Sequence, residues 1–379
     1  MGIVAIDDPK AYGGRVIRFI RDWASAGKAG VALLLLLLWG TGRVMTDRHE
    51  WSQWVWWIPS PLLLGVACVL AAWAMASGRR RRRARWVRRA AGAASMLGVL
   101  HLLLVEWRYG VGILGVGGPA AQGSLRVVFW NPSLPRGGGV ADRVLAASPD
   151  VAIIANPPLR DEGLSLDDLD RAMGPGAMTL SAGNVLVATR APVLRWGVTT
   201  LGLEGRVARV GYSGEGPDHW IDPGHAAFVE LDASGTLGRT IVVWIVDLPS
   251  DLSLVRHEVT KQAADVIAGF DGPVWSRDAE GRFVSAGARG ERGFPRADVL
   301  IGDFNIPRGS HSLRALTGGL RDAYALAGMG PMGTWPRSGA LHHLDQAFVG
   351  EGIGVGRYAV RDPGIGLHRM IIVELTGQD

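Results

Sequence analysis

Apolar residues follow two different patterns along the chain, and the change comes near residue 124. Before that point they form long, almost unbroken runs at residues 29–44, 54–77 and 90–107. A run of about 20 mostly apolar residues is long enough to cross the hydrocarbon core of a bilayer as a helix. We therefore expect residues 1–109 to form a membrane domain with three transmembrane helices, followed by a Gly-rich linker at 110–123.

After residue 124 the apolar runs are short, rich in Val and Ile, and separated by Gly, Pro and Asp. Such runs predict β-strands at 125–130, 150–155, 184–190, 226–232, 239–247, 297–304, 344–350, 357–360 and 370–375. Apolar side chains at helical spacing predict one amphipathic helix at 253–270. Many strands with few helices between them predict an α/β domain over residues 124–379, built from two packed mixed β-sheets flanked by helices.

Charged residues near the apolar runs set the expected orientation in the membrane. A basic segment with eight arginines, residues 79–89, joins the second and third runs. Short basic loops beside membrane spans stay in the cytoplasm. Three spans then place the N-terminus in the cytoplasm and the C-terminal domain outside the inner or plasma membrane of the cell. A cleaved signal peptide is the alternative for the first run, and the two runs that follow disfavour it.

The distribution of charge also limits the partners. Residues 1–120 contain 16 Lys and Arg against 6 Asp and Glu, whereas the remainder contains 24 against 29. The C-terminal domain is therefore mildly acidic, and a nucleic-acid partner is not expected because duplex binding depends on neutralising phosphates with Lys and Arg. The single cysteine, Cys68, excludes an intramolecular disulfide.

Several predicted strands end in a polar side chain. The residues are Asn131, Asn156, Asp247, Asp303, Asn305, Asp345 and, before the last strand, His368. Asn and Asp at strand ends commonly form turns by accepting hydrogen bonds from nearby backbone N–H groups. Residues collected from the ends of many strands are also how an α/β scaffold builds an active site. Both interpretations stay open for each residue taken alone.

Six short motifs follow one another in this domain. They are W-N (130–131), P-D (149–150), G-N-V-L-V-A-T-R-A-P-V (183–193), G-D-F-N (302–305), L-D-Q-A-F (344–348) and H-R (368–369). Over residues 124–376 their order resembles the endonuclease/exonuclease/phosphatase superfamily, which has the fold of the DNase I-like nucleases. The three preceding apolar runs and G-T-W-P at 333–336 resemble a bacterial subgroup in which three membrane spans precede an extracytoplasmic domain of this fold.

The resemblance implies a divalent metal, Mg²⁺ or Mn²⁺, at a phosphate-binding site. By position it implies that Asp303 orients the attacking water and that Asn305 contacts the phosphoryl oxygens. It also implies that His368, paired with Asp345, stabilises charge or transfers a proton. The candidate residues around the metal are Asn131, Asn156 and Asp247. Hard divalent cations prefer oxygen ligands, and phosphoryl transfer depends on positioning and charge neutralisation.

Three positions depart from the pattern that the resemblance implies. Asn156 stands where the superfamily has Glu, Asp247 stands where it has His, and Leu367 stands where it has Asp. Two expected carboxylates near the metal are therefore neutral, and affinity for a divalent cation falls with ligand charge and number. Asp247 adds a carboxylate that could replace part of the lost charge.

Two functions remain in view. The first is a membrane-anchored, outward-facing phosphohydrolase that acts on a lipid-linked or small phosphate ester, with the lipid bilayer as its partner. The second is a non-catalytic extracytoplasmic binding or regulatory module on the same fold, in which Asp303 and Asn305 serve only the turn. A nuclease is disfavoured by the acidic domain and the outward orientation. Metal binding and phosphate release would separate the first two.

Overall fold

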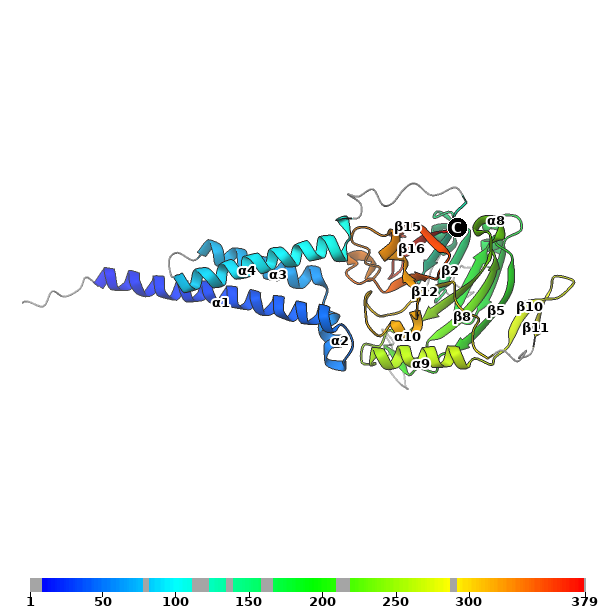
Figure 1. The fold of residues 1–379 in the computed structure, drawn as a ribbon, viewed down its shortest axis with the longest axis horizontal. Coiled ribbons are helices and arrows are strands. Elements are labelled where there is room, and N and C mark those ends of the chain that lie inside the picture. Colours follow the sequence, from blue (N-terminus) through cyan, green and yellow to red (C-terminus); the bar gives the residue numbers. More distant parts are fainter. Residues whose placement is uncertain are drawn as a thin grey trace, which may run out of the picture. The chain divides into compact units, whose positions relative to one another are not determined.

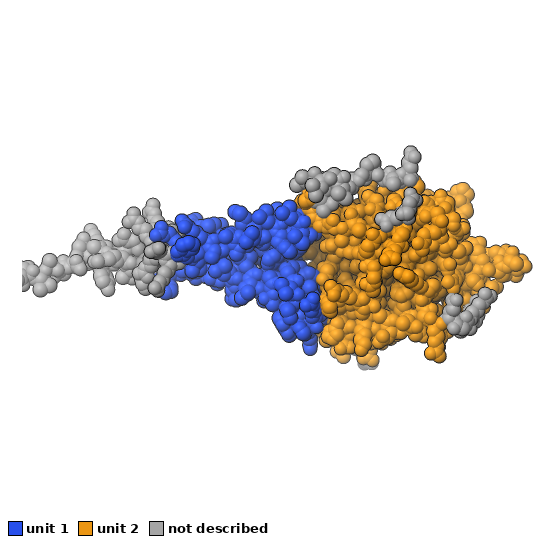
Figure 2. Space-filling model, in the orientation of Figure 1, with its two compact units in different colours: residues 1–107 blue, residues 108–379 orange. Residues whose placement is uncertain are grey.

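A computed structural model describes residues 9–77, 82–110, 123–133, 139–157, 166–208, 219–286 and 292–377. The chain divides into two compact units, Met1–Trp107 and Arg108–Asp379, which Figure 2 shows in blue and orange. Residues 111–122 of the expected linker and Arg79 to Arg81 of the basic segment lie outside the described residues.

Unit 1 is helical. Its elements are α1 (Pro9–Met45), α2 (Glu50–Trp56), α3 (Ser60–Ser77), α4 (Arg82–His101) and the π-helix η1 (Leu102–Glu106). Within the described residues, three helical segments are long and apolar enough to cross a membrane: Trp23–Met45, Ser60–Ser77 and Arg85–Glu106. The second of these begins at Ser60, and residues 50–56, which include the start of the predicted second span, form the separate helix α2. Membrane association is therefore possible for this unit.

Small residues let the helices of unit 1 approach closely. Ala67, Ala71 and Ala74 of α3 are buried in one cluster with residues of α1 and α4. A Cβ added at Gly98 would lie 2.6 Å from a methyl carbon of Leu64, so this glycine also keeps the helices close. Small residues at helix contacts are typical of helices that pack in a bilayer.

Unit 2 contains two large mixed sheets and a separate hairpin, β6 (Gly205–Ala208) with β7 (His219–Asp222). In the described residues the first sheet has the order β15-β16-β1-β2-β4-β3 and the second has the order β11-β10-β5-β8-β9-β12-β14-β13. The strands of the first sheet are β1 (Leu125–Trp130), β2 (Val151–Ala155), β3 (Met178–Ala182), β4 (Val185–Thr189), β15 (Ile353–Arg361) and β16 (Met370–Gly377). Those of the second are β5 (Val193–Thr200), β8 (His225–Asp232), β9 (Thr240–Asp247), β10 (Val274–Arg277), β11 (Phe283–Ala286), β12 (Val299–Asp303), β13 (Arg321–Asp322) and β14 (Asp345–Val349).

Alternation of side chains along the strands produces four layers. In β1, Val127 and Phe129 face the second sheet, while Val128 and Trp130 face outward, as the period of two in a strand requires. The outward face of the first sheet packs against α6 (Val140–Leu145) and α7 (Leu166–Met173). The outward face of the second sheet packs against α9 (Arg256–Gly269) and α10 (Arg314–Thr317). Figure 1 shows α9 lying along the second sheet.

This arrangement confirms the predicted architecture, two mixed sheets packed face to face and flanked by helices. Each of the nine predicted strands overlaps an observed strand. The predicted helix at 253–270 is α9, which begins three residues later, at Arg256. The sequence pattern did not indicate β3, β5, β10, β11 and β13 or the hairpin of β6 and β7. Most of these strands are short and partly exposed, and β5, although eight residues long, has only two buried residues.

Candidate active site

Three carboxylates lie side by side at one end of the second sheet. Asp303 is the direct neighbour of Asp247 in the parallel pair of β9 and β12, and of Asp345 in the antiparallel pair of β12 and β14. Residues directly opposite one another in a ladder project from the same face. Alternate residues before each aspartate, such as Ile245 and Ile301, belong to the core between the sheets. The three aspartates therefore continue this core face as a buried acidic row.

The first sheet contributes amides that face this row. Asn131 follows β1, and its Nδ2 donates a hydrogen bond of 2.8 Å to Asp303 Oδ2. Asn156 follows β2, and its Nδ2 donates a hydrogen bond of 2.9 Å to Asp247 Oδ2. The parallel strands β1 and β2 end at the same sheet edge, so both amides arrive on one side of the space between the sheets.

His368 completes the row. It immediately precedes Arg369 and β16, and its Nδ1 donates a hydrogen bond of 2.9 Å to Asp345 Oδ2 and lies 3.6 Å from Asp303 Oδ2. Two contacts hold this pair in place. Trp130 Nε1 donates to the carbonyl oxygen of His368, and Thr334 Oγ1 accepts hydrogen bonds from the backbone N–H groups of Leu344 and Asp345. The imidazole and both carboxylates are consequently fixed before any ligand binds.

Burial and mutual repulsion shift the acid–base properties of the row. Burial, with the charges of Asp303 and Asp222, raises the pKa of Asp247 well above its usual value. Burial, with the charge of Asp345, raises the pKa of Asp303 to about 6. Burial alone would lower the pKa of His368, but Asp345 and Asp303 raise it to about 9. The imidazole is therefore a cation at neutral pH, beside more negative charge than it can offset.

Asn305 lies at the turn after β12. It adopts a left-handed backbone conformation with φ of 47°, which Asn tolerates better than most residues. Its backbone N–H donates to Asp303 Oδ1, and its Nδ2 donates to the carbonyl oxygen of Leu248. In this structure the side chain joins the loops after β9 and β12, so the turn interpretation describes its contacts. Its predicted contact with phosphoryl oxygens stays a prediction.

The predicted metal ligands differ in whether their oxygen atoms are free to bind a cation. Asn131 Oδ1 already accepts hydrogen bonds from the N–H and hydroxyl groups of Ser133, and Asn156 Oδ1 accepts one from Asn184 Nδ2. Leu367 has no ligand atom and is 55% exposed. The amide oxygens of Asn131 and Asn156 are therefore already engaged, whereas Asp247 offers a carboxylate; their predicted role as metal ligands stays a prediction.

A different set of donors fits a cation better. One ligand atom from each of Asp303, Asp345 and His368 lies within 4.8 Å of the others, and all three residues are buried. Asp345 Oδ1 is buried and has no hydrogen-bond partner among the residues that the structure describes. An unsatisfied carboxylate oxygen beside a second carboxylate is a donor that a cation would satisfy. This buried Asp–Asp–His group could hold a metal.

Two further residues belong to the site and were not predicted from the sequence. Asn184 Nδ2 lies within hydrogen-bonding distance of Asn156 Oδ1 and 3.4 Å from Asp247 Oδ2. His225 is the direct neighbour of Asp247 in the pair of β8 and β9, and its buried Nδ1 is without a hydrogen-bond partner in the described ranges. Burial lowers the pKa of His225, with partial compensation from Asp222. Asn184 is part of the G-N-V-L motif, but His225 had no comparable sequence signal.

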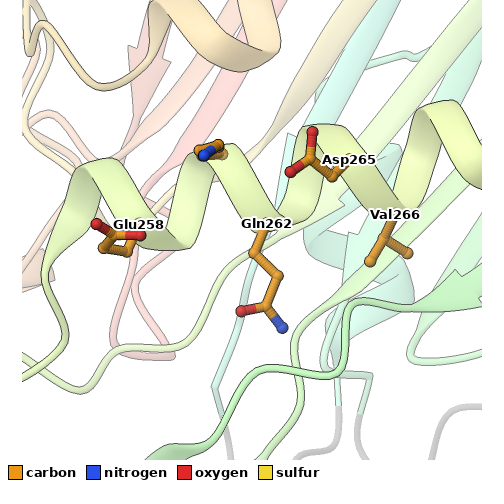
Figure 3. A pocket seen from close by; sticks show the side chains of 5 residues that line it. Glu258, Gln262, Asp265 and Val266 are labelled. Atoms are coloured by element: carbon orange, nitrogen blue, oxygen red, sulfur yellow. The ribbon is translucent and has the colours of Figure 1, made fainter.

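A surface hollow on unit 2 lies away from the acidic row. It has a volume of about 380 Å³ and is lined by Glu258, Lys261, Gln262, Asp265 and Val266 along the exposed face of α9, as Figure 3 shows. Gln262 Nε2 already donates to the carbonyl oxygens of two loop residues. The hollow shares no residue with the acidic row, so we assign it no part in the site.

The chain shows distant similarity to several solved structures. No protein-family model matches the sequence, and no curated protein sequence matches it. Among solved structures, an endonuclease/exonuclease/phosphatase family protein from Bacteroides thetaiotaomicron is 17% identical with a TM-score of 0.43, and covers 68% of this chain and 98% of its own. A mannosyl-6-phosphatase from the same species is 17% identical with a TM-score of 0.44, and covers 67% of this chain and 100% of its own. A family member from Beutenbergia cavernae is 16% identical with a TM-score of 0.44, and covers 67% of this chain and 72% of its own.

The side chains of the site define the chemistry that it can perform. Asn131 with Asp303, and His368 with Asp345, form two hydrogen-bonded pairs, and His368 Nδ1 lies 3.6 Å from Asp303 Oδ2. This cluster combines carboxylates that can accept a proton with an imidazolium that can donate one. An arrangement of this kind suits acid–base chemistry on an anionic substrate.

Proposed function

We propose that unit 2 is a phosphohydrolase domain that faces outward from a membrane and acts on a lipid-linked or small phosphate ester. The observation that carries the proposal is the cluster at the sheet ends of two hydrogen-bonded pairs, Asn131 with Asp303 and His368 with Asp345, in which His368 Nδ1 lies 3.6 Å from Asp303 Oδ2. These are the positions at which the sequence motifs predicted water orientation, charge stabilisation and proton transfer.

Each member of the group has a separate role. The Asp303 carboxylate, held by Asn131 Nδ2 and the N–H of Asn305, orients the attacking water and accepts its proton. The raised pKa of Asp303, about 6, makes that carboxylate a better base than an ordinary aspartate near neutral pH. The His368 imidazolium, held by Asp345, binds a phosphoryl oxygen and can donate a proton to the leaving group.

The proposal includes a divalent cation, Mg²⁺ or Mn²⁺, held by Asp303 and Asp345 with His368 beside them. When bound, such a cation supplies charge neutralisation at the phosphoryl oxygens. The carboxylate of Asp247, next to Asp303 on the neighbouring strand, adds negative charge on the side where Asn156 replaces an expected acid. Its amide hydrogen bond from Asn156 keeps this carboxylate directed toward the row.

The orientation of the chain is part of the same proposal. Arginines 79 to 89 favour a cytoplasmic loop between the second and third membrane segments, which places unit 2 outside the inner or plasma membrane. Labelling with a membrane-impermeant thiol reagent tests this. A cysteine introduced at the exposed Glu280 should react in intact cells, and one introduced at Arg83 should react only after the cells are opened. The opposite pattern would reverse the orientation.

One observation favours the second candidate, a binding module without turnover. Both ends of the Asn156 amide are engaged by neighbouring side chains, and Leu367 faces solvent where an acid was expected. A site with these substitutions can still bind an anionic ester through the His368 imidazolium. In that case the domain would hold a phosphate ester without cleaving it.

Activity assays with matched variants separate the two candidates. The purified full-length chain in detergent, supplied with Mg²⁺ or Mn²⁺, is tested for phosphate release from phosphate monoesters, diesters and lipid pyrophosphates. We expect His368→Gln and Asp303→Asn each to lower the rate by about 100-fold or more. His257→Gln on the exposed surface of α9 is the control and should keep the wild-type rate. Wild-type rates in both site variants would overturn the site, whereas ester binding without release from any substrate would support the binding module.

A further inference from the structure

Asp345 is the first residue of β14, and the sheet supports this end of the strand on one side only. On that side Asp345 is paired with Asp303 of β12. On the other side β13 contains only two residues, which pair with Phe348 and Val349 at the far end of β14. The segment that leads into Asp345 therefore depends on contacts other than the ladder with β13.

The backbone of this segment is attached to a loop of the same sheet. The N–H of Phe304 donates a hydrogen bond of 3.1 Å to the carbonyl oxygen of Leu344, and the N–H of Arg308 donates one of 3.1 Å to that of His343. Phe304 and Arg308 belong to the loop that follows Asp303 in β12. Both bonds therefore stay within the second sheet.

One side-chain contact of this segment crosses to the first sheet. His343 Nε2 forms a hydrogen bond of 2.7 Å with the hydroxyl group of Tyr358 on β15. Tyr358 is 3% exposed and belongs to the core between the sheets. Burial, with the charges of Asp322 and Asp345, raises the pKa of Tyr358 well above its usual value, so the phenol stays protonated. A neutral hydroxyl of the first sheet thus holds the segment that carries Asp345 in the second.

The position of Asp345 matters to both of its carboxylate oxygens. Oδ2 accepts the hydrogen bond of 2.9 Å from His368 Nδ1, and Oδ1 is buried without a hydrogen-bond partner among the residues that the structure describes. Hydrogen bonds weaken steeply as their distance and angle depart from the optimum. A small displacement of Asp345 would therefore release the imidazole of His368 and move the oxygen that is open to a ligand.

We propose that Tyr358 is a positioning residue that holds Asp345 in place through His343, and thereby fixes the orientation of the His368 imidazole. This inference rests on the proposed function for the reaction itself, and it adds a residue of β15, a strand that has no part in the acidic row. Tyr358 acts through two other residues and not on the substrate. Its loss should therefore lower kcat and leave KM nearly unchanged.

Tyr358→Phe removes only the hydroxyl group, and Tyr324→Phe is the matched control. Tyr324 is 2% exposed and lies in the same core, and its hydroxyl donates a hydrogen bond of 2.9 Å to the carbonyl oxygen of Gly330. Each variant loses a buried hydrogen bond, so the two Tm values should fall to within about 2 °C of each other. A difference between the variants at the site then reports the contact with His343.

The first readout is the NMR signal of the His368 Nδ1–H group, which requires neither metal nor substrate. It is recorded on the full-length protein in detergent with isotopically labelled histidine, and the signal that disappears in His368→Gln identifies it. In the wild type and in Tyr324→Phe the proton should resonate far downfield and exchange slowly with water, because it binds a carboxylate. In Tyr358→Phe it should move upfield and exchange faster.

The second readout is phosphate release, which separates failure of this inference from failure of the proposed function. Tyr358→Phe should lower kcat by about tenfold and change KM by less than about twofold, whereas Tyr324→Phe should keep both constants. An unchanged His368 signal in Tyr358→Phe, an equal change in both variants, or an unchanged kcat would overturn the positioning role. The expected change of the signal, with no phosphate release from any ester by the wild type, would support the positioning of His368 and reject the hydrolase.

Discussion

Replacing Gly302 with alanine tests the spacing of the strands that carry the acidic row. Gly302 precedes Asp303 in β12 and is paired with Val246 of β9 in the parallel ladder. A Cβ built on Gly302 would lie 1.8 Å from the carbonyl oxygen of Val246, and 2.8 Å and 2.9 Å from its carbonyl carbon and nitrogen. All three are backbone atoms of the neighbouring strand, so no side-chain rotation can relieve the overlap.

The expected loss of stability can be worked from these contacts. The strands must separate until the Cβ–oxygen distance reaches an ordinary contact of about 3.4 Å, which breaks ladder hydrogen bonds at Gly302 and Asp303. Two lost hydrogen bonds cost about 2 kcal/mol, and overpacking adds about 1–3 kcal/mol. We therefore expect Gly302→Ala to lower the free energy of unfolding by about 3–5 kcal/mol. In a domain of this size that corresponds to a fall in Tm of about 10 °C.

The assay is thermal unfolding of the full-length protein in detergent, together with hydrogen exchange of the β9 and β12 amides. Gly235→Ala is the control, because a Cβ there meets no atom within 4 Å and should change stability by less than about 0.5 kcal/mol. A Tm for Gly302→Ala within about 2 °C of wild type would refute the strand spacing described here. It would also remove the explanation for a glycine before the site aspartate.

Three other changes probe the site and its support. Asn156→Glu restores an acid beside Asp247, so Mg²⁺ affinity measured by calorimetry should rise about tenfold while the metal-free Tm falls; an unchanged affinity would remove Asn156 from the metal site. Arg256 is fully buried, and its guanidinium donates two hydrogen bonds to carbonyl oxygens of the loop after Asp247. Arg256→Met removes both bonds and should lower the free energy of unfolding, measured in urea, by about 3 kcal/mol. Arg314→Met, at an exposed position, is the control. Thr334→Val leaves the buried backbone N–H groups of Leu344 and Asp345 without their acceptor. We expect the free energy of unfolding in urea to fall by about 2–4 kcal/mol. An unchanged free energy of unfolding would contradict the role of Thr334 in holding Asp345.

The fold was largely predictable because its signals are local. The runs at 125–130, 239–247 and 297–304 are apolar on both faces, which is what a strand between a second sheet and a helix layer requires. The amphipathic spacing of α9 likewise predicted a helix packed on a sheet. The edge strand β11 and its neighbour β10 carry weaker patterns, because they are partly exposed and their exposed positions tolerate polar residues.

The candidate residues were predictable as a set, but their contacts were not. The order of polar residues at strand ends pointed to Asn131, Asp303, Asp345 and His368, which the structure places in two neighbouring hydrogen-bonded pairs. Nothing local indicated that Asn305 would donate its amide to the loop after β9. That contact joins residues 57 positions apart, and it depends on how two strands align in the sheet.

The sequence by itself determined nine of the strands and the membrane-length helices, because apolar periodicity and run length are properties of neighbouring residues. Only the tertiary structure decided which polar groups meet. Register in the second sheet makes Asp247, Asp303 and Asp345 direct neighbours and adds His225 to the same row. A shift of one residue in either ladder would turn an aspartate from the space between the sheets to the helix layer. The acidic row and its shifted pKa values therefore arise from strand register and loop contacts, which act between segments far apart in the chain.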